Sequence, residues 1–229
     1  MKYRYQMHAH TSPCSACAVI SPEELVEGLY SGGYSGCVIT NHFYNGNSGI
    51  DRKLPYNDFI KKYEEDYLEC KKAAEKYNLD ILFGIEERLL DCLEILCYGI
   101  TPQFLYDNPD LLSDYSAENW YKAIHEFGAV CIQAHPFRDR EYITNPRTLP
   151  LDCIDGIEVY NGHGNHNSSN DIAYAWAVKY SLPMLSGSDF HGNTEMEPGG
   201  VYFEEYVDDS KAVAQALRDK KYTLKCYQK

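Results

Sequence analysis

The chain has 229 residues, of which 44% are hydrophobic and 24% charged, so it is long enough for one globular domain with a full core. Its formal net charge of −13 at pH 7 should make the surface repel nucleic acid, and we expect no double-stranded nucleic-acid partner. No apolar run is long enough to cross a bilayer and Met1–His8 lacks the apolar segment of a signal peptide, so we expect no membrane partner and a cytoplasmic location.

Strand and helix patterns alternate along the chain, and no repeat or linker divides residues 1–229. A first strand is predicted at residues 3–7. Ser21–Glu24 then supplies an N-cap, a first-turn proline and a capping-box glutamate for a helix that ends at Gly32–Gly33. Further strands are predicted at 37–40, 80–85, 93–98, 129–133, 156–160 and 184–186, and further helices at 57–77, 117–127, 169–180 and 210–222. This alternation predicts a single α/β domain with a parallel sheet, and about seven units without a Gly-rich dinucleotide loop favour a closed barrel.

Most of the eight histidines follow a predicted strand directly. His8 and His10 come after the first strand, and their spacing in an extended segment puts both rings on one side of the chain. The other polar residues at strand ends are His42, Glu86, His135, Asp189 and His191. Because the carboxyl ends of parallel barrel strands share one face, we expect these side chains to meet there.

Imidazole together with carboxylate is a ligand set for Zn²⁺, Mn²⁺ or Fe²⁺. Glu86 could bridge two ions, and a bound water would then become a hydroxide nucleophile near neutral pH. Glu87 alternates to the opposite face, so only one of the two glutamates should enter the site. His125 lies inside a predicted helix and is assigned a structural role, whereas His163 and His166 in a polar loop fit either interpretation.

Two other patterns compete with a metal site. Cys14 and Cys17 form a Cys-x-x-Cys that could be a redox pair or half of a zinc site, but no second pair follows, so we interpret them as thiols close to the metal site. The remaining cysteines mostly lie in apolar stretches and are interpreted as buried thiols. Ser188, Asp189 and His191 are too close in sequence for a hydrolytic triad, and no nucleophile elbow is present.

Several motifs, in this order, resemble those of the PHP (polymerase and histidinol phosphatase) family: His8-Ala9-His10, Thr40-Asn41-His42, Gly84-Ile85-Glu86, Ala134-His135-Pro136, Tyr160-Asn161 and Ser186-Gly187-Ser188-Asp189-Phe190-His191. The resemblance covers nearly the whole chain and implies a distorted (β/α)7 barrel of the TIM type, two or three divalent ions and phosphoester hydrolysis. It implies one ion held by His8, His10, Glu86 and Asp189, a second reached by Glu86 and His135, and a third served by His42 and His191.

The chain departs from this pattern in three places. A further histidine is usual shortly after the first motif, where this chain has Cys14-Ser15-Ala16-Cys17. Another is usual at the end of the fourth strand, which here reads Cys97-Tyr98-Gly99, and Asn41 stands where aspartate is usual. The second and third metal positions are therefore each short of a ligand unless water, Cys14, Cys17 or substrate fills the gap, and we expect one to three ions.

The sequence therefore predicts a metal-dependent phosphoesterase acting on a small phosphate ester. Asp189 and His191 are expected to take part in catalysis, and Arg138, three residues after His135, to hold a phosphate oxygen. The alternative for residues 138–141 is a solvated surface loop whose charges pair with each other. Two other functions remain open: hydrolysis of an amide or other non-phosphate bond by the same metal site, and a non-catalytic binding module.

Overall fold

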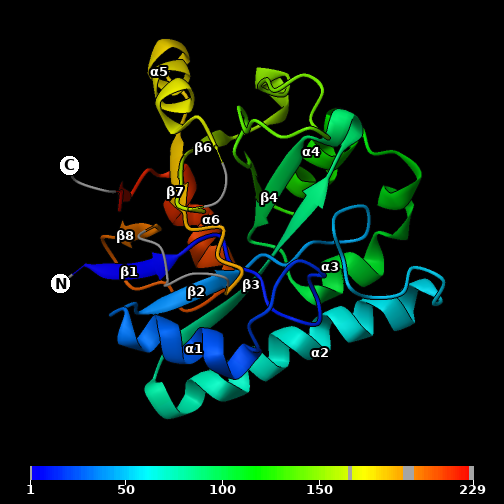
Figure 1. Ribbon diagram of the computed structural model, residues 1–229, viewed down its shortest axis with the longest axis vertical. Helices are drawn as coiled ribbons and strands as arrows, with labels where there is room; N and C mark the ends of the chain where they lie inside the picture. The colour runs from blue at the N-terminus through cyan, green and yellow to red at the C-terminus, as the bar shows by residue number, and fades with distance from the viewer. Residues whose placement is uncertain (1, 165–166, 193–198, 227–229) are drawn as a thin grey trace.

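The computed structural model of the protein describes residues 2–164, 167–192 and 199–226 (Figure 1). Its strands are β1 Tyr3–Gln6, β2 Gly36–Ile39, β3 Asp80–Arg88, β4 Glu94–Tyr98, β5 Val130–Gln133, β6 Gly156–Asn161, β7 Met184–Gly187, β8 Val201–Phe203 and β9 Tyr222–Leu224. Its α-helices are α1 Pro22–Ser31, α2 Tyr56–Ala74, α3 Pro102–Asp107, α4 Ala117–Glu126, α5 Asn170–Tyr180 and α6 Ser210–Arg218. The described strands form one sheet in the order β7-β6-β5-β4-β3-β2-β1-β8-β9, and contacts of β7 with β8 and β9 bring its two ends together into a nearly closed barrel.

The strand directions differ in part from the prediction. The α/β class is confirmed, and β1, β2 and β3 run parallel, as do β5, β6 and β7. The prediction of an all-parallel sheet is wrong, because β4 is antiparallel to both β3 and β5. Only the short turn Leu90–Cys92 joins β3 to β4, and a connection this short cannot carry the chain back to the start of a parallel strand.

Two further differences lie in the connections. The helix predicted at 210–222 ends at Arg218, and the chain continues as β9, which pairs with β8. Helix α3 was not predicted from the sequence. By contrast, the capping box of α1 is confirmed, since Ser21 Oγ accepts from the backbone N–H of Glu24, and the Glu24 carboxylate accepts from that of Ser21 at 2.9 Å.

The interior of the barrel is filled at one end by apolar side chains. Residues from seven strands meet in a single buried cluster, which requires the sheet to curl around them. Helix α6 packs against β3, β4 and β5 and adds Val213, Ala214 and Leu217 to the same cluster. Side chains alternate between the two faces of a strand, so inward positions nearer the other end of the barrel are left for polar residues.

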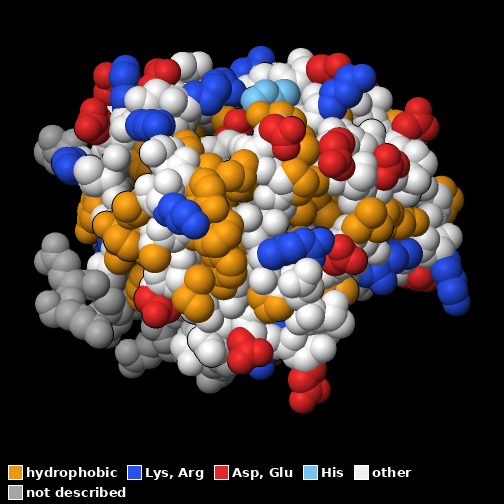
Figure 2. All heavy atoms as spheres, turned by 90° about the horizontal axis from the view of Figure 1, so that it is seen from above, with side chains coloured by type: hydrophobic (Ala, Val, Ile, Leu, Met, Phe, Trp, Pro, Cys, Tyr) orange, Lys and Arg blue, Asp and Glu red, His pale blue; other side chains and the backbone are white. Residues whose placement is uncertain are grey.

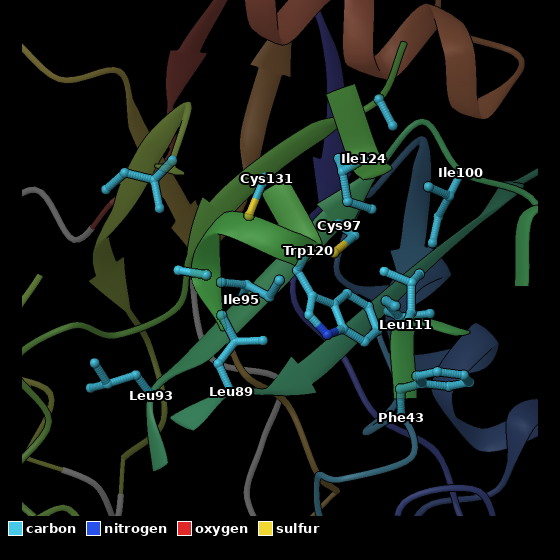
Figure 3. Close-up of a cluster of buried hydrophobic side chains, with 14 of the residues drawn as sticks. Phe43, Leu89, Leu93, Ile95, Cys97, Ile100, Leu111, Trp120, Ile124 and Cys131 are labelled. Atoms are coloured by element: carbon cyan, nitrogen blue, oxygen red, sulfur yellow. The ribbon is translucent and has the colours of Figure 1, made fainter. Parts of the chain in front are cut away.

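The outer face of the sheet is covered by helices (Figure 1). Helices α1 and α2 pack over β2 and β3. A second outer cluster surrounds Trp120 of α4, whose indole is fully buried between Phe43 and strands β4 and β5 (Figure 3). Among the described residues, no helix is both long enough and apolar enough to span a bilayer. The cytoplasmic location stays a prediction.

Replacing Trp120 by alanine should destabilise the protein strongly, because the change removes a fully buried indole and leaves a cavity among residues that pack on its neighbours. We expect the free energy of unfolding to fall by about 3–5 kcal/mol. Denaturant unfolding of Trp120→Ala would measure this, with Tyr174→Ala as control, since that side chain is 55% exposed and its loss should cost within about 0.5 kcal/mol. Equal effects of the two changes would contradict the assigned core.

Candidate metal centre

The polar residues predicted to meet do lie together, at the end of the barrel interior opposite the apolar cluster. Their place follows from strand alternation. On β3, Leu82 belongs to the interior cluster, and Glu86, four residues later, points the same way. His42 stands in the same relation to Val38 after β2. Side chains at even spacing share a face, so each of these two strands contributes apolar packing first and a metal-ligating group afterwards.

Four side chains surround one point at the spacing that a metal ion requires. His8 Nε2 lies 3.3 Å from Glu86 Oε1 and 3.3 Å from Asp189 Oδ1. His10 Nε2 lies 3.4 Å from Glu86 Oε2 and 3.1 Å from the same Asp189 oxygen. Ligand atoms about 2.1 Å from a tetrahedral zinc are ~3.4 Å apart. These four are the residues predicted for the first ion.

The remaining predicted ligands adjoin this group. His42 Nδ1 lies 2.8 Å from Glu86 Oε2, and His135 Nε2 lies 3.1 Å from Glu86 Oε1, so Glu86 stands between imidazoles on several sides. The His191 ring is 4.2 Å from that of His10, centroid to centroid. In the part of the chain that the structure describes, four sets of three side chains have ligand atoms close enough to share an ion: His10, His42 and His191; His8, His135 and Asp189; His8, His10 and Glu86; His42, Glu86 and Glu94.

Three imidazoles use their second nitrogen for a supporting hydrogen bond. His8 Nδ1 contacts Glu158 Oε1 at 3.0 Å, His10 Nδ1 contacts Ser15 Oγ at 3.2 Å, and His191 Nδ1 donates to the backbone carbonyl of Asp189 at 2.8 Å. Histidines that bind metals characteristically donate their other N–H in this way, which fixes the ring and leaves one nitrogen for the ion. Glu158 is therefore a supporting residue that the sequence did not reveal.

The buried atoms themselves indicate that a cation fits. Among the described residues, His8 Nε2, His42 Nδ1 and Glu86 Oε2 are buried without a well-aligned hydrogen bond, although His42 Nδ1 and Glu86 Oε2 face each other at 2.8 Å. Leaving such groups unsatisfied costs about 1–3 kcal/mol each, more when they are charged. A divalent ion would give all three a partner, and imidazole nitrogen with carboxylate oxygen is a donor set that Zn²⁺, Mn²⁺ or Fe²⁺ accepts.

The titration of these groups is governed by burial and by their neighbours. Burial disfavours a charged imidazole, but nearby carboxylates, that of Asp189 first, outweigh it and raise the pKa of His8 well above its usual value. Glu86 likewise raises the pKa of His42 against the effect of burial. Burial, together with His191, instead holds the pKa of His10 well below its usual value. These directions favour the protonated forms of His8 and His42 when no ion is bound.

The backbone around the site is held in uncommon conformations. His135 and Asp189 have positive φ angles of 25° and 53°, which cost energy in residues other than glycine and persist only where the surroundings impose them. The backbone of Phe190 accepts from His10 N at 2.9 Å and donates to His8 O at 3.2 Å, which ties the Asp189–His191 segment to the first motif. The structure thus brings residues 8–10 and 189–191 together through main-chain bonds.

The fourth strand supplies a carboxylate where the sequence indicated none. The family resemblance predicts a ligand at Cys97–Gly99, but β4 runs in reverse, so its first residue is the one that reaches the site. Glu94 is buried, and its Oε2 lies 3.6 Å from His135 Nε2 while its Oε1 accepts from Arg88 Nη2 at 2.9 Å. Glu94 is therefore a candidate ligand for the metal position that was predicted to lack one from the fourth strand. The short turn before β4 is the feature of the sequence that indicates it.

The Asn41 side chain supports the cluster through hydrogen bonds, so the presence of asparagine where aspartate is usual leaves the set of candidate ligands unchanged. Its Oδ1 accepts from the backbone N–H of Thr11 at 2.7 Å and from Ser15 Oγ at 2.9 Å, and its Nδ2 donates to Asp66 at 2.8 Å. Ser15 in turn contacts His10. Burial raises the pKa of Asp66 to about 6, although Thr11 and Asn41 lower it through hydrogen bonds. The amide thus organises the loop that orients His10.

Arg138 is 4% exposed, so it does not belong to a solvated surface loop. Its Nη2 donates to Asp189 Oδ2, and the Arg138 charge adds to that of His8 in holding the pKa of Asp189 well below its usual value against the effect of burial. Asn161 Nδ2 donates to the Glu158 carboxylate at 2.9 Å and to Asp189 Oδ2 at 3.3 Å. In this arrangement Arg138 positions Asp189, and its contact with a phosphate oxygen stays a prediction.

The remaining glutamate and histidines considered in the sequence analysis differ in their position relative to the cluster. Glu87 faces the outer side, as predicted, and accepts from the backbone of Asn45 and Gly46. His125 of α4 pairs with Asp155, the residue before β6, at 2.8 Å and belongs to no set of candidate ligands. The His163 ring lies 5.3 Å from that of His191 at the edge of the cluster, whereas His166 lies outside the described residues.

The two cysteines of the Cys-x-x-Cys differ in environment. Cys14 is buried in the core, where burial, reinforced by Asp66, raises its pKa well above the usual value. Burial also acts to raise the pKa of Cys17, but hydrogen bonds with His191 and His42 outweigh it and lower that pKa to about 6. Both are free thiols, and only Cys17 adjoins the predicted ligands.

The sequence is similar to short stretches of much longer proteins. It is 27% identical over 149 residues to a DNA polymerase III of the PolC type from Oceanobacillus iheyensis, and 27% identical over 165 residues to an isoleucine–tRNA ligase from Lacticaseibacillus casei. These stretches cover 63% and 70% of this chain but 9% and 14% of those proteins, so the chain spans only a small part of the relatives it matches. No protein-family model matches the chain.

Solved structures share the fold at low sequence identity. A protein assigned as a metal-dependent phosphoesterase from Bifidobacterium adolescentis matches with a TM-score of 0.57 and 17% identity, covering 93% of this chain and 95% of that one. An amidohydrolase from Chromobacterium violaceum gives 0.60 at 15% identity, over 96% and 97%. Endonuclease Q gives 0.65 at 14% identity, over 96% of this chain and 57% of the endonuclease. The fold and the His/carboxylate cluster together fit a metal-dependent hydrolase.

The expectation that double-stranded nucleic acid is excluded is wrong. Endonuclease Q, which shares this fold, is seen in complex with a 27-mer duplex that has an abasic lesion at the active site. The prediction failed because net charge is a sum over the whole surface, whereas binding depends on the sign of the local electrostatic potential at the site. On the face in Figure 2, Lys and Arg side chains lie among Asp and Glu, and bound cations would add positive charge at the cluster itself.

Metal binding should release protons, because His8 and His42 hold protons without an ion and must lose them to become ligands. Protons compete with the metal ion for the histidine nitrogens, so the affinity for the metal ion should rise as the pH increases from about 6 to 8. Calorimetric titration of Zn²⁺ or Mn²⁺ in buffers of different ionisation enthalpy would count the released protons. An affinity and an observed heat that do not depend on pH or buffer would refute this assignment.

Glu158→Gln should weaken metal binding without removing a predicted ligand, because it replaces the carboxylate that fixes His8. We expect about a 10–100-fold loss of affinity for the tightest ion, as is typical of supporting residues. Competition with a chelator would measure it. Glu126→Gln is the matched control, since its side chain is 69% exposed and far from the cluster, and its affinity should equal that of the wild type.

Proposed function

We propose that this chain, which resembles the PHP family in its motifs and its fold, is a metal-dependent phosphoesterase. The resemblance is supported on two sides: the likeness to the polymerase in sequence and the likeness to the phosphoesterase and endonuclease structures in fold. One observation carries the proposal. His8, His10, Glu86 and Asp189 place their ligand atoms 3.1–3.4 Å apart around a common point in a buried, polar part of the barrel.

The chemistry of phosphate esters suits such a site. Divalent ions held by these residues would polarise the phosphoryl oxygens and lower the pKa of a bound water. The protein's own residues hold the geometry: Glu86 reaches both the first group and His42 or His135, and Asp189 joins His8 to Arg138. His191 and His163 lie side by side near the edge, where a substrate would approach, and His191 is proposed to contact it.

We propose phosphate esters as the substrate class, and a small phosphate ester as the more specific prediction. The family resemblance supports phosphate, and the positive charge of ions at this site would attract it. A duplex or single-stranded DNA substrate belongs in the same class of test, since the endonuclease with this fold acts at a lesion in a duplex.

A second candidate is hydrolysis of an amide or other non-phosphate bond. The observation in its favour is the likeness to an amidohydrolase that covers nearly the whole of both chains. The two functions can be separated by inhibition: inorganic phosphate should compete with substrate at a phosphoesterase site, whereas carboxylate-type inhibitors should compete at an amidohydrolase site.

The test of the proposed function is metal-dependent turnover. Purified protein would be assayed with Mn²⁺, Zn²⁺ or Fe²⁺ against phosphomonoesters, phosphodiesters and a duplex oligonucleotide with an abasic site. His10→Ala should lower turnover by more than about 100-fold, since even supporting residues cost about 10–100-fold. His125→Ala should leave it unchanged, because His125 is a residue of α4 that pairs with Asp155, the residue before β6.

Two outcomes would count against the proposal. Turnover that is equal in the wild type and in His10→Ala would show that the activity arises elsewhere. Absence of metal-stimulated hydrolysis across the whole panel, with amide substrates cleaved instead, would favour the second candidate.

A further inference from the structure

A cavity of about 400 Å³ lies outside the His/carboxylate cluster, where helix α2 meets the loop after β1 and the segment before α2. Helix α2 contributes four charged side chains whose spacing places them on one face of the helix: Lys62, Glu65, Asp66 and Glu69. Ile50 and Leu54 supply part of its apolar wall. In the described part of the chain, no residue that lines the cavity belongs to a set of candidate metal ligands, so the cavity is separate from the metal centre.

The loops that enclose the cavity are held together by main-chain hydrogen bonds. Gly49 N donates to Cys14 O at 2.8 Å, and Ala16 N donates to Asn47 O at 2.9 Å. Cys14 and Gly49 both line the cavity, so this part of its wall is fixed before any ligand arrives. A preformed cavity with apolar walls and a few polar groups is typical of sites for small molecules.

Asp66 brings a buried carboxylate to this cavity. The residue is 5% exposed, and its Oδ2 accepts from Thr11 Oγ1 at 2.6 Å and from Asn41 Nδ2 at 2.8 Å. Among the described residues, its Oδ1 is buried without a hydrogen-bond partner. The two oxygens of a carboxylate point apart, so Oδ1 is turned away from those two donors. An unsatisfied buried oxygen costs free energy, and a donor in the cavity that Asp66 lines would remove that cost.

The charges around the cavity favour a cationic ligand. Its acidic residues outnumber its basic one, since Asp51, Glu65, Asp66 and Glu69 stand against Lys62. Such an excess of carboxylates raises the local concentration of cations. An organic cation fits better than a metal ion, because Asp66 belongs to none of the described sets of three side chains whose ligand atoms could share an ion. The apolar wall likewise suits a ligand with an apolar body.

We propose that this cavity binds a small organic ammonium, with its cationic group at Asp66 Oδ1 and its apolar part against Ile50 and Leu54. An ammonium is a strong donor to a carboxylate, and its apolar part would remove the surface of both aliphatic side chains from water. The site goes beyond the proposed hydrolysis, because it lies apart from the metal centre and takes a ligand of the opposite charge to a phosphate ester.

Binding at this cavity should also affect the metal centre. Asn41, which donates to Asp66, accepts from Ser15 Oγ at 2.9 Å, and Ser15 Oγ lies 3.2 Å from His10 Nδ1. An ammonium at Oδ1 would fix the carboxylate that anchors this series of hydrogen bonds, and with it the loop that orients His10. The ammonium and a divalent ion should therefore strengthen each other's binding, because such coupling is reciprocal. This coupling rests on the proposed metal centre, whereas the ammonium site itself does not.

The experiment is calorimetric titration of the full chain with phenethylammonium, and with phenethyl alcohol and phenylpropionate as neutral and anionic probes of similar shape. At about pH 7.5 the Asp66 carboxyl is ionised, since burial raises its pKa only to about 6. We expect the ammonium to bind at least about tenfold more tightly than the alcohol. Asp66→Asn should weaken ammonium binding at least about tenfold. Lys62→Gln, which removes the basic residue of the cavity, should tighten it by about 1.5–5-fold.

Glu126→Gln is the matched control, since its side chain is 69% exposed and does not line the cavity, and its affinity should equal that of the wild type. Equal affinities for the ammonium and the alcohol, tighter binding of phenylpropionate, or an unchanged affinity in Asp66→Asn would overturn the proposal. Thermal unfolding checks that Asp66→Asn keeps its fold. If it does not, Lys62→Gln decides, because Lys62 is exposed, and an affinity no higher than that of the wild type would overturn the proposal.

The coupling is tested by repeating the titration on protein loaded with Zn²⁺, which should bind the ammonium at least about fivefold more tightly than metal-free protein. Equal affinities would refute the coupling and leave the ammonium site standing. Failure of the protein to bind Zn²⁺ would refute the metal centre, while the three probes on metal-free protein would still decide the ammonium site. No arm of the experiment depends on turnover, so the outcomes are distinct from those that test the proposed function.

Discussion

The arrangement of this molecule depends on keeping ionisable groups inside the barrel. Glu86 and Asp189 are almost fully buried, yet imidazoles and a guanidinium surround them, so neither carboxylate is an isolated charge. An unpaired buried carboxylate would cost several kcal/mol, and the nearby cations remove that penalty only in this geometry. Main-chain bonds at Phe190, the Asn41 amide and the Glu158 carboxylate all act to hold that geometry.

Strand alternation explains how such a group can be built by a chain whose ligands are spread from position 8 to position 191. Each inward position repeats every second residue, so one strand can pack apolar residues low in the barrel and present a polar residue higher up. Leu82 and Glu86 of β3 are one such pair. The fold therefore separates a dry half from a polar half within one continuous interior, and helix α6 closes the dry half.

Much of this arrangement could be predicted from the sequence, because His8, Glu86 and Asp189 each follow a short apolar strand and such ends converge in a barrel. Glu158 could not be predicted, since it lies within β6 and resembles any polar residue of a strand. Glu94 could not be predicted either, because the strand pattern indicates a parallel β4 and so places the site-facing end of β4 at its last residue, whereas β4 is antiparallel. The nucleic-acid prediction failed for a different reason: a sum over all charges carries no information about their position.

The reversal of β4 has a consequence for the comparison of related chains. Register pairs Glu86 with Leu96 and Arg88 with Glu94, so all four share the inner face, and a shift by one residue would turn Ile95 inward and Glu94 outward. The turn before β4, in which Asp91 and Cys92 both adopt positive φ angles, fixes that choice. In homologues whose turn between β3 and β4 has another length, the metal-ligating residue that points inward from β4 should be located by counting residues forward from that turn. An alignment anchored on Gly99, the residue after β4, would instead match residues at the opposite end of the barrel.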